Sequence, residues 1–293
     1  MNKRIRVTLA AVCAFALVGA FALIGCSSGT EQKAEEPKAE QSEQHEAVEL
    51  QVFAANSLSK AMEDIQTLYK ESHDWVSFAD TQYKASGELN EMLGAGSYAD
   101  ILISASKGSM DTAEESGYID EGTRFDMFVN DLVIVSKEGS GLTDVTLQDI
   151  ADGKYTVSVG DESVPAGNYA AQALSTVGAY ADPSGKTGAD ITGKGGQFVG
   201  ITPVLDTSVG NVCKHAQSGD VDVAIVYSSD VYRFEGVEVV GVIPDDTHKK
   251  IVYPGAITKN SEQAEAADEF LQWCVTDAEA KKIWQEWGFE LAA

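Results

Sequence analysis

The sequence predicts an α/β protein whose sheets are mostly parallel and are flanked by helices. Short segments rich in β-branched and other apolar residues recur along the chain, as expected for strands. Most of them lead through a short polar turn into a segment with apolar residues at helical spacing. This order builds parallel sheets that are covered on both faces. The roughly 245 residues after residue 47 are enough for one large or two smaller α/β domains.

The first 25 residues are predicted to be a lipoprotein signal peptide. Lys3, Arg4 and Arg6 form a basic start, and an apolar run from Val7 to Ile24 follows it. The run ends in Leu-Ile-Gly-Cys, which resembles the bacterial lipobox, so Cys26 is the expected lipidation site. An uncleaved anchor helix is the alternative interpretation. In both cases the rest of the chain is exported and held at the outer face of the cell membrane, the periplasmic side if an outer membrane exists.

Residues 26–47 are predicted to be a flexible acidic tether. The segment is rich in Glu, Gln, Lys and Ala and has no large apolar side chain, so it cannot bury enough surface to offset the entropy lost on ordering. The whole chain has a formal net charge of −25 at pH 7, and loss of the signal peptide removes three positive charges from it. A chain this acidic is a poor partner for nucleic acid or anionic membrane surfaces. The lipid is therefore its only expected contact with the membrane.

Two of the four cysteines, Cys213 and Cys274, fall in the expected globular part. They could pair in an oxidising compartment, but both have apolar surroundings in sequence, so two buried thiols are at least as good an interpretation. The cysteines and histidines show no spacing typical of a metal site. We expect neither a bare metal cation nor a cofactor.

The first half of the expected fold consists of strand–turn–helix units. Residues 48–53 alternate between polar and apolar side chains like a strand, and apolar residues at helical spacing follow Ser57, a candidate helix N-cap. A second strand, residues 75–78, leads through a loop at 83–85 to Ser86, which again stands at a helix start. The rest of this half is expected to form a strand at 99–104 and a helix near 109–116.

The second half begins with a strand at residues 131–135, where the chain is expected to cross into a second lobe. Pro165 suits the first position of a helix because it has a fixed φ and no amide hydrogen. Ser208 is expected to cap a helix that Gly219 ends. Residues 179–200 are rich in Gly, Asp, Lys and Thr and are expected to be a surface loop. The other expected strands are 154–159, 221–227, 237–242 and 251–257, and the other helices are 147–151, one from 228, 264–275 and 278–287.

Four strand-to-helix turns and one strand end bring short polar groups to the carboxyl ends of the strands, where α/β folds bind ligands. The first amides of a helix have no partner within it and lie at the positive end of its dipole, so they suit an anion. The positions are Ser57, Ser86, Ala166, Val209 and Tyr227, none of them charged. Alternatives remain: the serines could be plain helix caps, the turn before Ala166 an ordinary connection, and Tyr227 a core residue.

Six parts of the sequence together resemble the molybdate-binding proteins of bacterial molybdate ABC transporters. They lie between Val52 and Phe289 and are Val52–Leu58, Ala85–Leu89, Tyr98–Ala105, Val159–Asp161 with Val164–Ala170, Ala224–Asp230 and Ile243–His248. The resemblance implies a two-lobed periplasmic-binding-protein fold of type II, with residues 48–129 and 251–293 in lobe I and 130–250 in lobe II. It also implies an oxyanion in the cleft between the lobes. The implied ligands are the hydroxyls and amides of Ser57 and Ser86, the amides of Ala166 and Val209, and the Tyr227 hydroxyl.

The resemblance implies an extracytoplasmic solute-binding protein that captures molybdate, and tungstate with it, for delivery to an ABC importer. Such a protein is expected to be a monomer without enzymatic activity. A binding protein for another oxyanion such as sulfate is one alternative. An exported hydrolase is another, disfavoured because no Gly-x-Ser-x-Gly elbow is present and no histidine follows a candidate serine convincingly. The chain departs from the family pattern at Asn56, where a small residue is usual, after Val209, where an arginine is usual, and at 179–200, which is longer than expected.

Overall fold

The computed structural model describes residues 46–292. The chain divides into Met1–Gln44 and His45–Ala293, and every element below belongs to the second unit. The predicted signal peptide, Cys26 and all but the last two residues of the predicted tether lie outside the described residues. Within the described part, no helix has the length and apolar character needed to cross a membrane.

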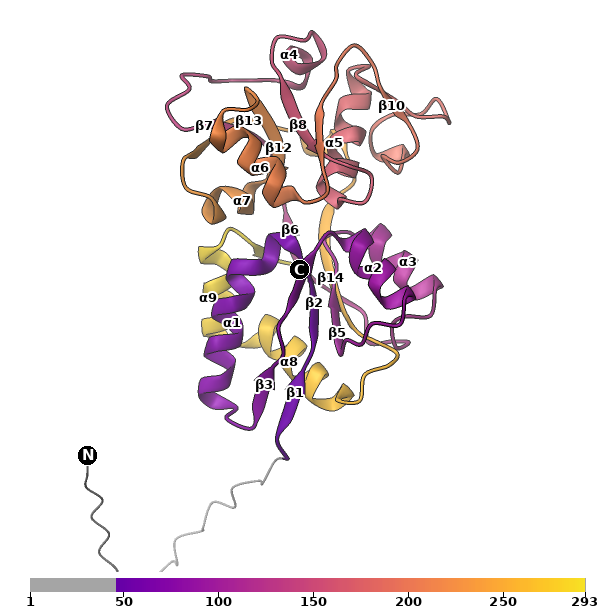
Figure 1. Ribbon diagram of the computed structural model, residues 1–293, viewed down its shortest axis with the longest axis vertical. Helices are drawn as coiled ribbons and strands as arrows, with labels where there is room; N and C mark the ends of the chain where they lie inside the picture. Colours follow the sequence, from indigo (N-terminus) through magenta and orange to yellow (C-terminus); the bar gives the residue numbers. More distant parts are fainter. Residues whose placement is uncertain (1–45, 293) are drawn as a thin grey trace, which may run out of the picture. The chain divides into compact units, whose positions relative to one another are not determined.

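Lobe I, as we use the term, is a six-stranded sheet with helices on both sides of it (Figure 1). Its strands are β2 (Val52–Ala55), β4 (Gln82–Lys84), β5 (Ile101–Ile103), β6 (Phe125–Asn130), β14 (Ile251–Ile257) and β15 (Glu290–Leu291). Their order across the sheet is β15-β6-β14-β5-β2-β4. The helices are η1 (Asn56–Leu58), α1 (Ser59–Ser72), α2 (Ser86–Gly94), α3 (Lys107–Glu115), α8 (Ala264–Thr276) and α9 (Ala278–Glu286). A parallel pair of strands, β1 (Val48–Leu50) and β3 (Val76–Phe78), completes the lobe.

Lobe II is built on a five-stranded sheet. Its strands are β7 (Leu132–Lys137), β8 (Val157–Gly160), β11 (Val204–Asp206), β12 (Val223–Tyr227) and β13 (Val237–Val242). Their order is β11-β8-β12-β7-β13. The helices are α4 (Leu147–Ala151), α5 (Pro165–Thr176), η2 (Gly188–Asp190), α6 (Val209–Ser218), α7 (Ser228–Arg233) and η3 (Asp245–Thr247). The short strands β9 (Tyr180–Ala181) and β10 (Gln197–Phe198) form a separate antiparallel pair.

The chain passes between the lobes twice. It leaves lobe I at the end of β6, passes through Asp131 and enters β7, and it returns between the end of β13 and the start of β14. The strands β6 and β14 are paired with each other, so the two connections lie side by side (Figure 1).

Both main sheets are mixed, which corrects the expectation that they are mostly parallel. The triplets β4-β2-β5 and β11-β8-β12 are parallel. The other neighbours in these sheets are antiparallel. The crossing explains part of this, because a chain that leaves on β6 and returns on β14 reverses its direction. The α/β class itself is confirmed, and the predicted turns still lie at the carboxyl ends of parallel strands.

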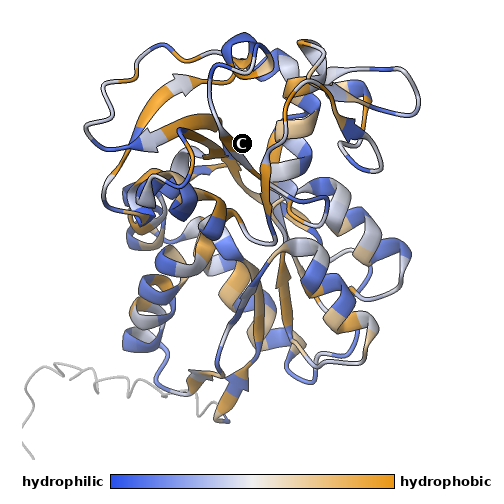
Figure 2. Ribbon diagram, turned by 45° about the horizontal axis from the view of Figure 1, so that its top comes forward, coloured by the Kyte–Doolittle hydropathy of each residue, from blue (hydrophilic) through white to orange (hydrophobic). Residues whose placement is uncertain are grey.

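The apolar faces predicted from sequence form the core. In α1 and η1, the side chains of Leu58, Met62, Ile65 and Tyr69 are completely covered, as their helical spacing predicted. Figure 2 shows the strands of both lobes mostly in the hydrophobic colour, whereas the helices are banded. Burial of each large aliphatic side chain contributes about 1.5–3 kcal/mol.

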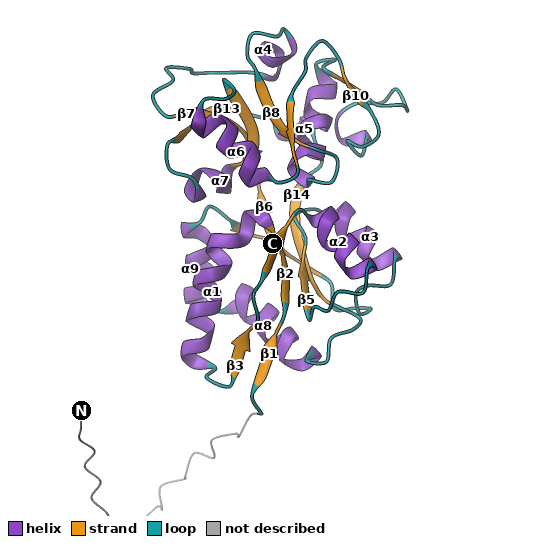
Figure 3. Cartoon of the chain, viewed as in Figure 1, coloured by secondary structure: helices purple, strands orange, loops and turns teal. Residues whose placement is uncertain are grey.

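Most predicted elements are confirmed, and some details differ. Residues 83–85 were expected to be a loop, but Tyr83 and Lys84 belong to β4, the edge strand of lobe I. The strands β6, β11 and β15 were not predicted, and the strand expected at 48–53 is divided into β1 and β2, which belong to different sheets. Residues 179–200 are not entirely loop, because they contain β9, η2 and β10 (Figure 3). The end signals of α6 are confirmed: the Ser208 side chain accepts from the Asn211 amide, and Gly219 has a φ of 81°.

Candidate functional site

A small cavity lies where lobe I meets lobe II. Its volume is about 10 Å³, close to the space that one water molecule needs. The lining residues are Ala55, Asn56, Ser57, Lys84, Ala85, Ser86 and Ala105 from lobe I, and Val164, Pro165, Val209 and Tyr227 from lobe II. The structure thus brings Ser57, Ser86, Val209 and Tyr227 together, and Ala166 directly follows Pro165.

Three helices, α2, α5 and α6, begin at this cavity. The first main-chain bonds of the three helices are Leu89 N to Ala85 O, Asn168 N to Val164 O and Val212 N to Ser208 O. The amides of Ser86, Ala166 and Val209 precede these bonds, so no carbonyl of their own helix pairs with them. Such amides, at the positive end of the helix dipole, provide donors for an anion.

The turn from β8 into α5 depends on close packing of main chain. A Cβ on Gly167 would overlap the carbonyl oxygen of Gly160, so helix and strand approach each other as only glycine permits. The Asp161 carboxylate accepts from the Ser163 amide at 2.8 Å, so this aspartate fixes the loop. Pro165 occupies the first position of α5, as predicted.

The two serines are buried, and neither caps its helix, so their interpretation as plain caps is wrong. Ser57 lies inside η1, which precedes α1, and its hydroxyl is 2.9 Å from the hydroxyl of Tyr253. Ser86 is the first residue of α2, and its Oγ accepts from the Ala105 amide at 3.0 Å. An Oγ that already accepts from the main chain keeps its own hydrogen for another acceptor.

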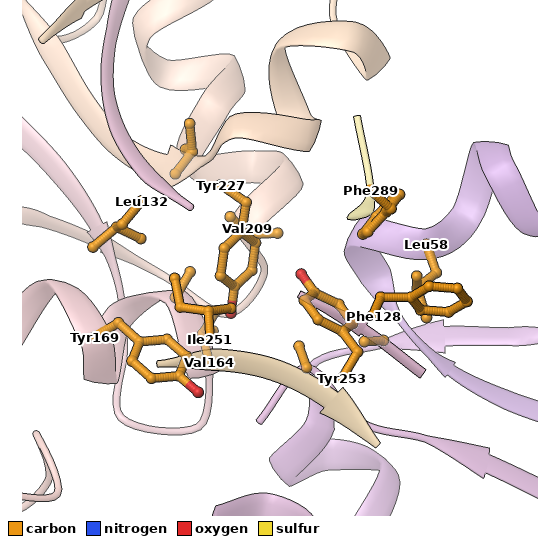
Figure 4. Packing of buried hydrophobic residues seen from close by; sticks show 14 of the residues in the cluster. Leu58, Phe128, Leu132, Val164, Tyr169, Val209, Tyr227, Ile251, Tyr253 and Phe289 are labelled. Carbon is orange, nitrogen blue, oxygen red and sulfur yellow. The ribbon is translucent and has the colours of Figure 1, made fainter. Parts of the chain in front are cut away.

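Tyr227 ends β12, and its side chain is 1 % exposed. Its hydroxyl has no hydrogen-bond partner within residues 46–292. The ring packs edge-on against Tyr253 with centroids 5.7 Å apart (Figure 4). Burial raises the pKa of Tyr227 well above its ordinary value, so the hydroxyl keeps its proton at neutral pH. An unpaired buried hydroxyl costs about 1–3 kcal/mol, and an acceptor bound in the cavity would remove that cost.

Arg233, which the sequence analysis did not identify, joins the lobes beside the cavity. Its Nη1 donates to the main-chain carbonyl of Asn56 at 2.5 Å and to its Oδ1 at 3.1 Å. Its Nη2 is paired with the buried carboxylate of Asp230. A Cβ on Gly210 would lie 2.9 Å from the Asn56 Oδ1. Asn56 and Gly210 are two of the departures from the family pattern, and they lie next to each other. Because Gly210 has no side chain, it leaves room for that of Asn56.

The cavity wall carries little charge. Among the lining residues only Lys84 is charged, and its ammonium is paired with Glu88 at 2.9 Å. The Asp100 carboxylate accepts from the Gln51 amide at 2.8 Å and so fixes the chain between β1 and β2. The described residues contain no group of three or more His, Cys, Asp or Glu that could hold a metal ion. The thiols of Cys213 and Cys274 are both free and buried.

The geometry does not favour nucleophilic catalysis. The hydroxyl of Ser57 contacts the phenol of Tyr253, and that of Ser86 contacts a main-chain amide. Neither of these partners is a general base that could activate a serine at neutral pH, because burial also raises the pKa of Tyr253. The arrangement can bind and orient a small anion.

Known proteins are similar to this chain in sequence and in fold. Residues 50–290 match the family of bacterial extracellular solute-binding proteins. The molybdate-binding protein ModA of Escherichia coli (strain K12) is 32 % identical over 250 residues, 82 % of this chain and 88 % of ModA. YvgL of Bacillus subtilis (strain 168), provisionally named an ABC transporter substrate-binding lipoprotein, is 28 % identical over 289 residues, 99 % of each chain.

A solved structure agrees with these relatives. The substrate-binding domain of a provisionally identified molybdenum ABC transporter from Clostridium difficile has a TM-score of 0.62 and 30 % identity, and the match covers 84 % of this chain and 100 % of that domain. The predicted periplasmic-binding-protein fold is thereby confirmed. The chain belongs to the bacterial extracellular solute-binding proteins and is a homologue of the molybdate-binding protein ModA.

Proposed function

We propose that this protein captures molybdate, and tungstate with it, outside the cytoplasm and delivers it to the permease of an ABC importer. The observation that carries the proposal is the buried Tyr227 hydroxyl, which lacks a partner in the described chain and shares a cavity with Ser57, Ser86 and Val209. The names of ModA and of the C. difficile domain associate those proteins with molybdate or molybdenum transport. We assign ligand roles to the hydroxyls and amides of Ser57 and Ser86, the amides of Ala166 and Val209, and the Tyr227 hydroxyl.

The donor-rich cavity favours a fully deprotonated tetrahedral dianion. Such an ion presents acceptors on every side, so each amide and hydroxyl finds a partner. A hydrogen-bearing phosphate would place its own hydroxyl against other donors, and each unpaired buried group costs about 1–3 kcal/mol. Sulfate carries the right charge but is smaller, so its oxygens cannot reach all donors at once. The net negative charge of the chain repels every dianion alike, so the discrimination must be local.

Binding requires movement of the lobes. The cavity of about 10 Å³ holds no more than a water molecule, so a tetrahedral oxyanion needs the walls to separate before it enters. Because donors come from both lobes, the bound ligand then favours the closed arrangement over the open one. The paired strands β6 and β14 are the connections about which such a movement occurs.

Calorimetric titration of the purified protein with molybdate, tungstate, sulfate and phosphate tests the proposal. We expect tight binding of molybdate and tungstate, much weaker binding of sulfate and almost none of phosphate near neutral pH. At a free ligand concentration one hundred times the Kd, linkage should raise the free energy of unfolding by about 2.7 kcal/mol. Thermal melts unmoved by saturating molybdate, tungstate and sulfate would refute the oxyanion hypothesis. Tighter binding of sulfate than of molybdate would make this a sulfate-binding protein instead.

The anchoring and assembly are proposals as well. We infer that the mature chain begins at a lipidated Cys26, is held at the outer face of the cell membrane by that lipid, and works as a monomer without enzymatic activity. Support comes from the basic and apolar start of the sequence and from YvgL, whose provisional name includes the word lipoprotein. Metabolic labelling with a radioactive fatty acid should mark the protein, and absence of label would exclude the lipid anchor.

A further inference from the structure

A chain of three buried side chains leads from the crossing between the lobes to the cavity. Asn130, at the end of β6, places its Nδ2 3.4 Å from the Tyr253 hydroxyl. The Tyr253 hydroxyl lies 2.9 Å from the Oγ of Ser57, which lines the cavity. These three side chains are at most 8 % exposed. Neither Tyr253 nor Asn130 lines the cavity itself.

The hydrogen-bond partners of Asn130 fix the direction of this chain. The main-chain amide of Asp131 can only donate, and it lies 3.0 Å from Oδ1, so the oxygen of the Asn130 amide must face it. Ser228 also donates to this oxygen at 2.8 Å. The Nδ2 group therefore faces Tyr253 and Ser229 and donates to both of their hydroxyls.

The hydrogen bonds are donated in one direction, from Asn130 to Tyr253 and from Tyr253 to Ser57. The Tyr253 hydroxyl accepts from Asn130, and its 2.9 Å hydrogen bond is to the Ser57 Oγ. The Tyr253 hydrogen is therefore donated to Ser57. The Ser57 Oγ then accepts, and its single hydrogen is left for the cavity. Burial raises the pKa of Tyr253, which keeps this phenol protonated.

We propose that Tyr253 and Asn130 are positioning residues that make the Ser57 hydroxyl an obligate donor toward the cavity and thereby help to reject oxyanions that carry a proton. This inference rests on the proposed function, since it concerns the selectivity of the same site. Without the order imposed by Tyr253, the Ser57 hydroxyl could rotate and accept from the hydroxyl of a protonated oxyanion. Ser86 is held in the same way by the Ala105 amide, so both serines present hydrogens.

The Tyr253→Phe variant removes the hydroxyl that orders Ser57. Titrations with sodium molybdate and sodium phosphate at pH 7, where every phosphate ion carries at least one proton, give the preference for molybdate. We expect the Kd for molybdate to rise about tenfold and the Kd for phosphate to rise about twofold at most. The preference for molybdate over phosphate should therefore fall at least about fivefold. The matched control is Tyr69→Phe, which removes another buried hydroxyl of lobe I, and it should leave the preference unchanged. An unchanged preference in Tyr253→Phe overturns the proposal.

Asn130→Asp provides a second variant of nearly the same shape. The new carboxylate accepts from Tyr253, so the order reverses and Ser57 turns its lone pairs to the cavity. We expect the preference for molybdate over phosphate to fall at pH 8 and to recover toward pH 6 as the buried carboxylate takes up a proton. Repulsion by the added charge alone would weaken the binding of molybdate and of phosphate alike. A preference equal to that of the wild type at both pH values contradicts the proposal.

The two hypotheses can fail separately. If the wild-type protein binds none of the oxyanions, the proposed function fails. The hydrogen-bond order of Asn130, Tyr253 and Ser57 is then tested by measurements of unfolding alone. A double-mutant cycle of Ser57→Ala and Tyr253→Phe should show coupling of at least about twofold in the unfolding equilibrium constant. Additive effects of the two substitutions would overturn the hydrogen-bond order.

Discussion

Replacement of Tyr227 by Phe should change stability and affinity in opposite directions. The Tyr227 hydroxyl is buried at the cavity and is unpartnered among the described residues. In the free protein, the substitution removes a polar group whose desolvation is not compensated. In the complex, it removes the proposed donor to the oxyanion. Loss of an ordinary core hydrogen bond would instead lower stability, so the signs distinguish a ligand role from a structural one.

The magnitudes follow from the burial. An unpaired buried polar group costs about 1–3 kcal/mol, and we take about 1 kcal/mol because some water reaches a cavity of this size. For a protein of this length, a gain of about 1 kcal/mol raises the Tm by about 2–4 °C. The lost donor should weaken molybdate by about 1–2 kcal/mol, which is about a 5- to 30-fold rise in Kd.

Two measurements check this prediction: thermal melts of the ligand-free protein and calorimetric titration with molybdate. We expect a higher Tm and a weaker affinity for Tyr227→Phe. The control Tyr69→Phe removes a hydroxyl that is also buried and unpartnered within the described chain, so it should raise the Tm without changing the affinity. A Tyr227→Phe protein that melts earlier and binds molybdate like the wild type would refute the reasoning.

Three further predictions concern the contact between the lobes, the turn before α5 and the anchor. Replacement of Arg233 by Met leaves the Asp230 carboxylate buried without its partner, which should lower the free energy of unfolding by about 3–5 kcal/mol at pH 7. Burial already raises the pKa of Asp230, and loss of the arginine raises it further. The folded variant therefore holds the proton of this carboxyl more tightly than the unfolded chain does. Its stability falls as the pH rises from the unfolded pKa of Asp230 to the folded one. The deficit should therefore shrink toward pH 4, and urea melts with the same deficit at both pH values would contradict this. Gly167→Ala should lower the free energy of unfolding by about 2 kcal/mol or more, because the new Cβ would overlap the main chain of Gly160. The control Gly108→Ala places its Cβ in open space and should be neutral or slightly stabilising. Equal urea midpoints of the two variants would count against the packing argument. Cys26→Ser should release a folded protein into the soluble fraction that still binds molybdate, and membranes that still hold all of this variant would count against the lipobox.

Local sequence determined the parts of this protein that depend on near neighbours. Ser208 and Gly219 mark the ends of α6 because a cap and a left-handed residue act within one helical turn. Pro165 marks the start of α5 for the same reason. Each of the candidate ligands Ser57, Ser86 and Val209 stands near the start of a helix, so local signals were enough to find them, although the strands β4 and β11 before Ser86 and Val209 were not predicted. Their gathering at one cavity agrees with the family resemblance, and their binding role stays a prediction.

The tertiary structure alone decided what depends on residues far apart in the chain. Arg233 bonds to Asn56 across 177 positions, and Tyr253 bonds to Ser57 across 196. No helical or strand period connects such pairs, because they meet only after both lobes have formed and β14 has returned beside β6. The antiparallel pairing in both sheets was missed for the same reason, since part of it follows from the crossing and not from the residues of the strands themselves. The sequence could therefore show which groups would face a ligand, whereas only the fold showed which side chains orient them.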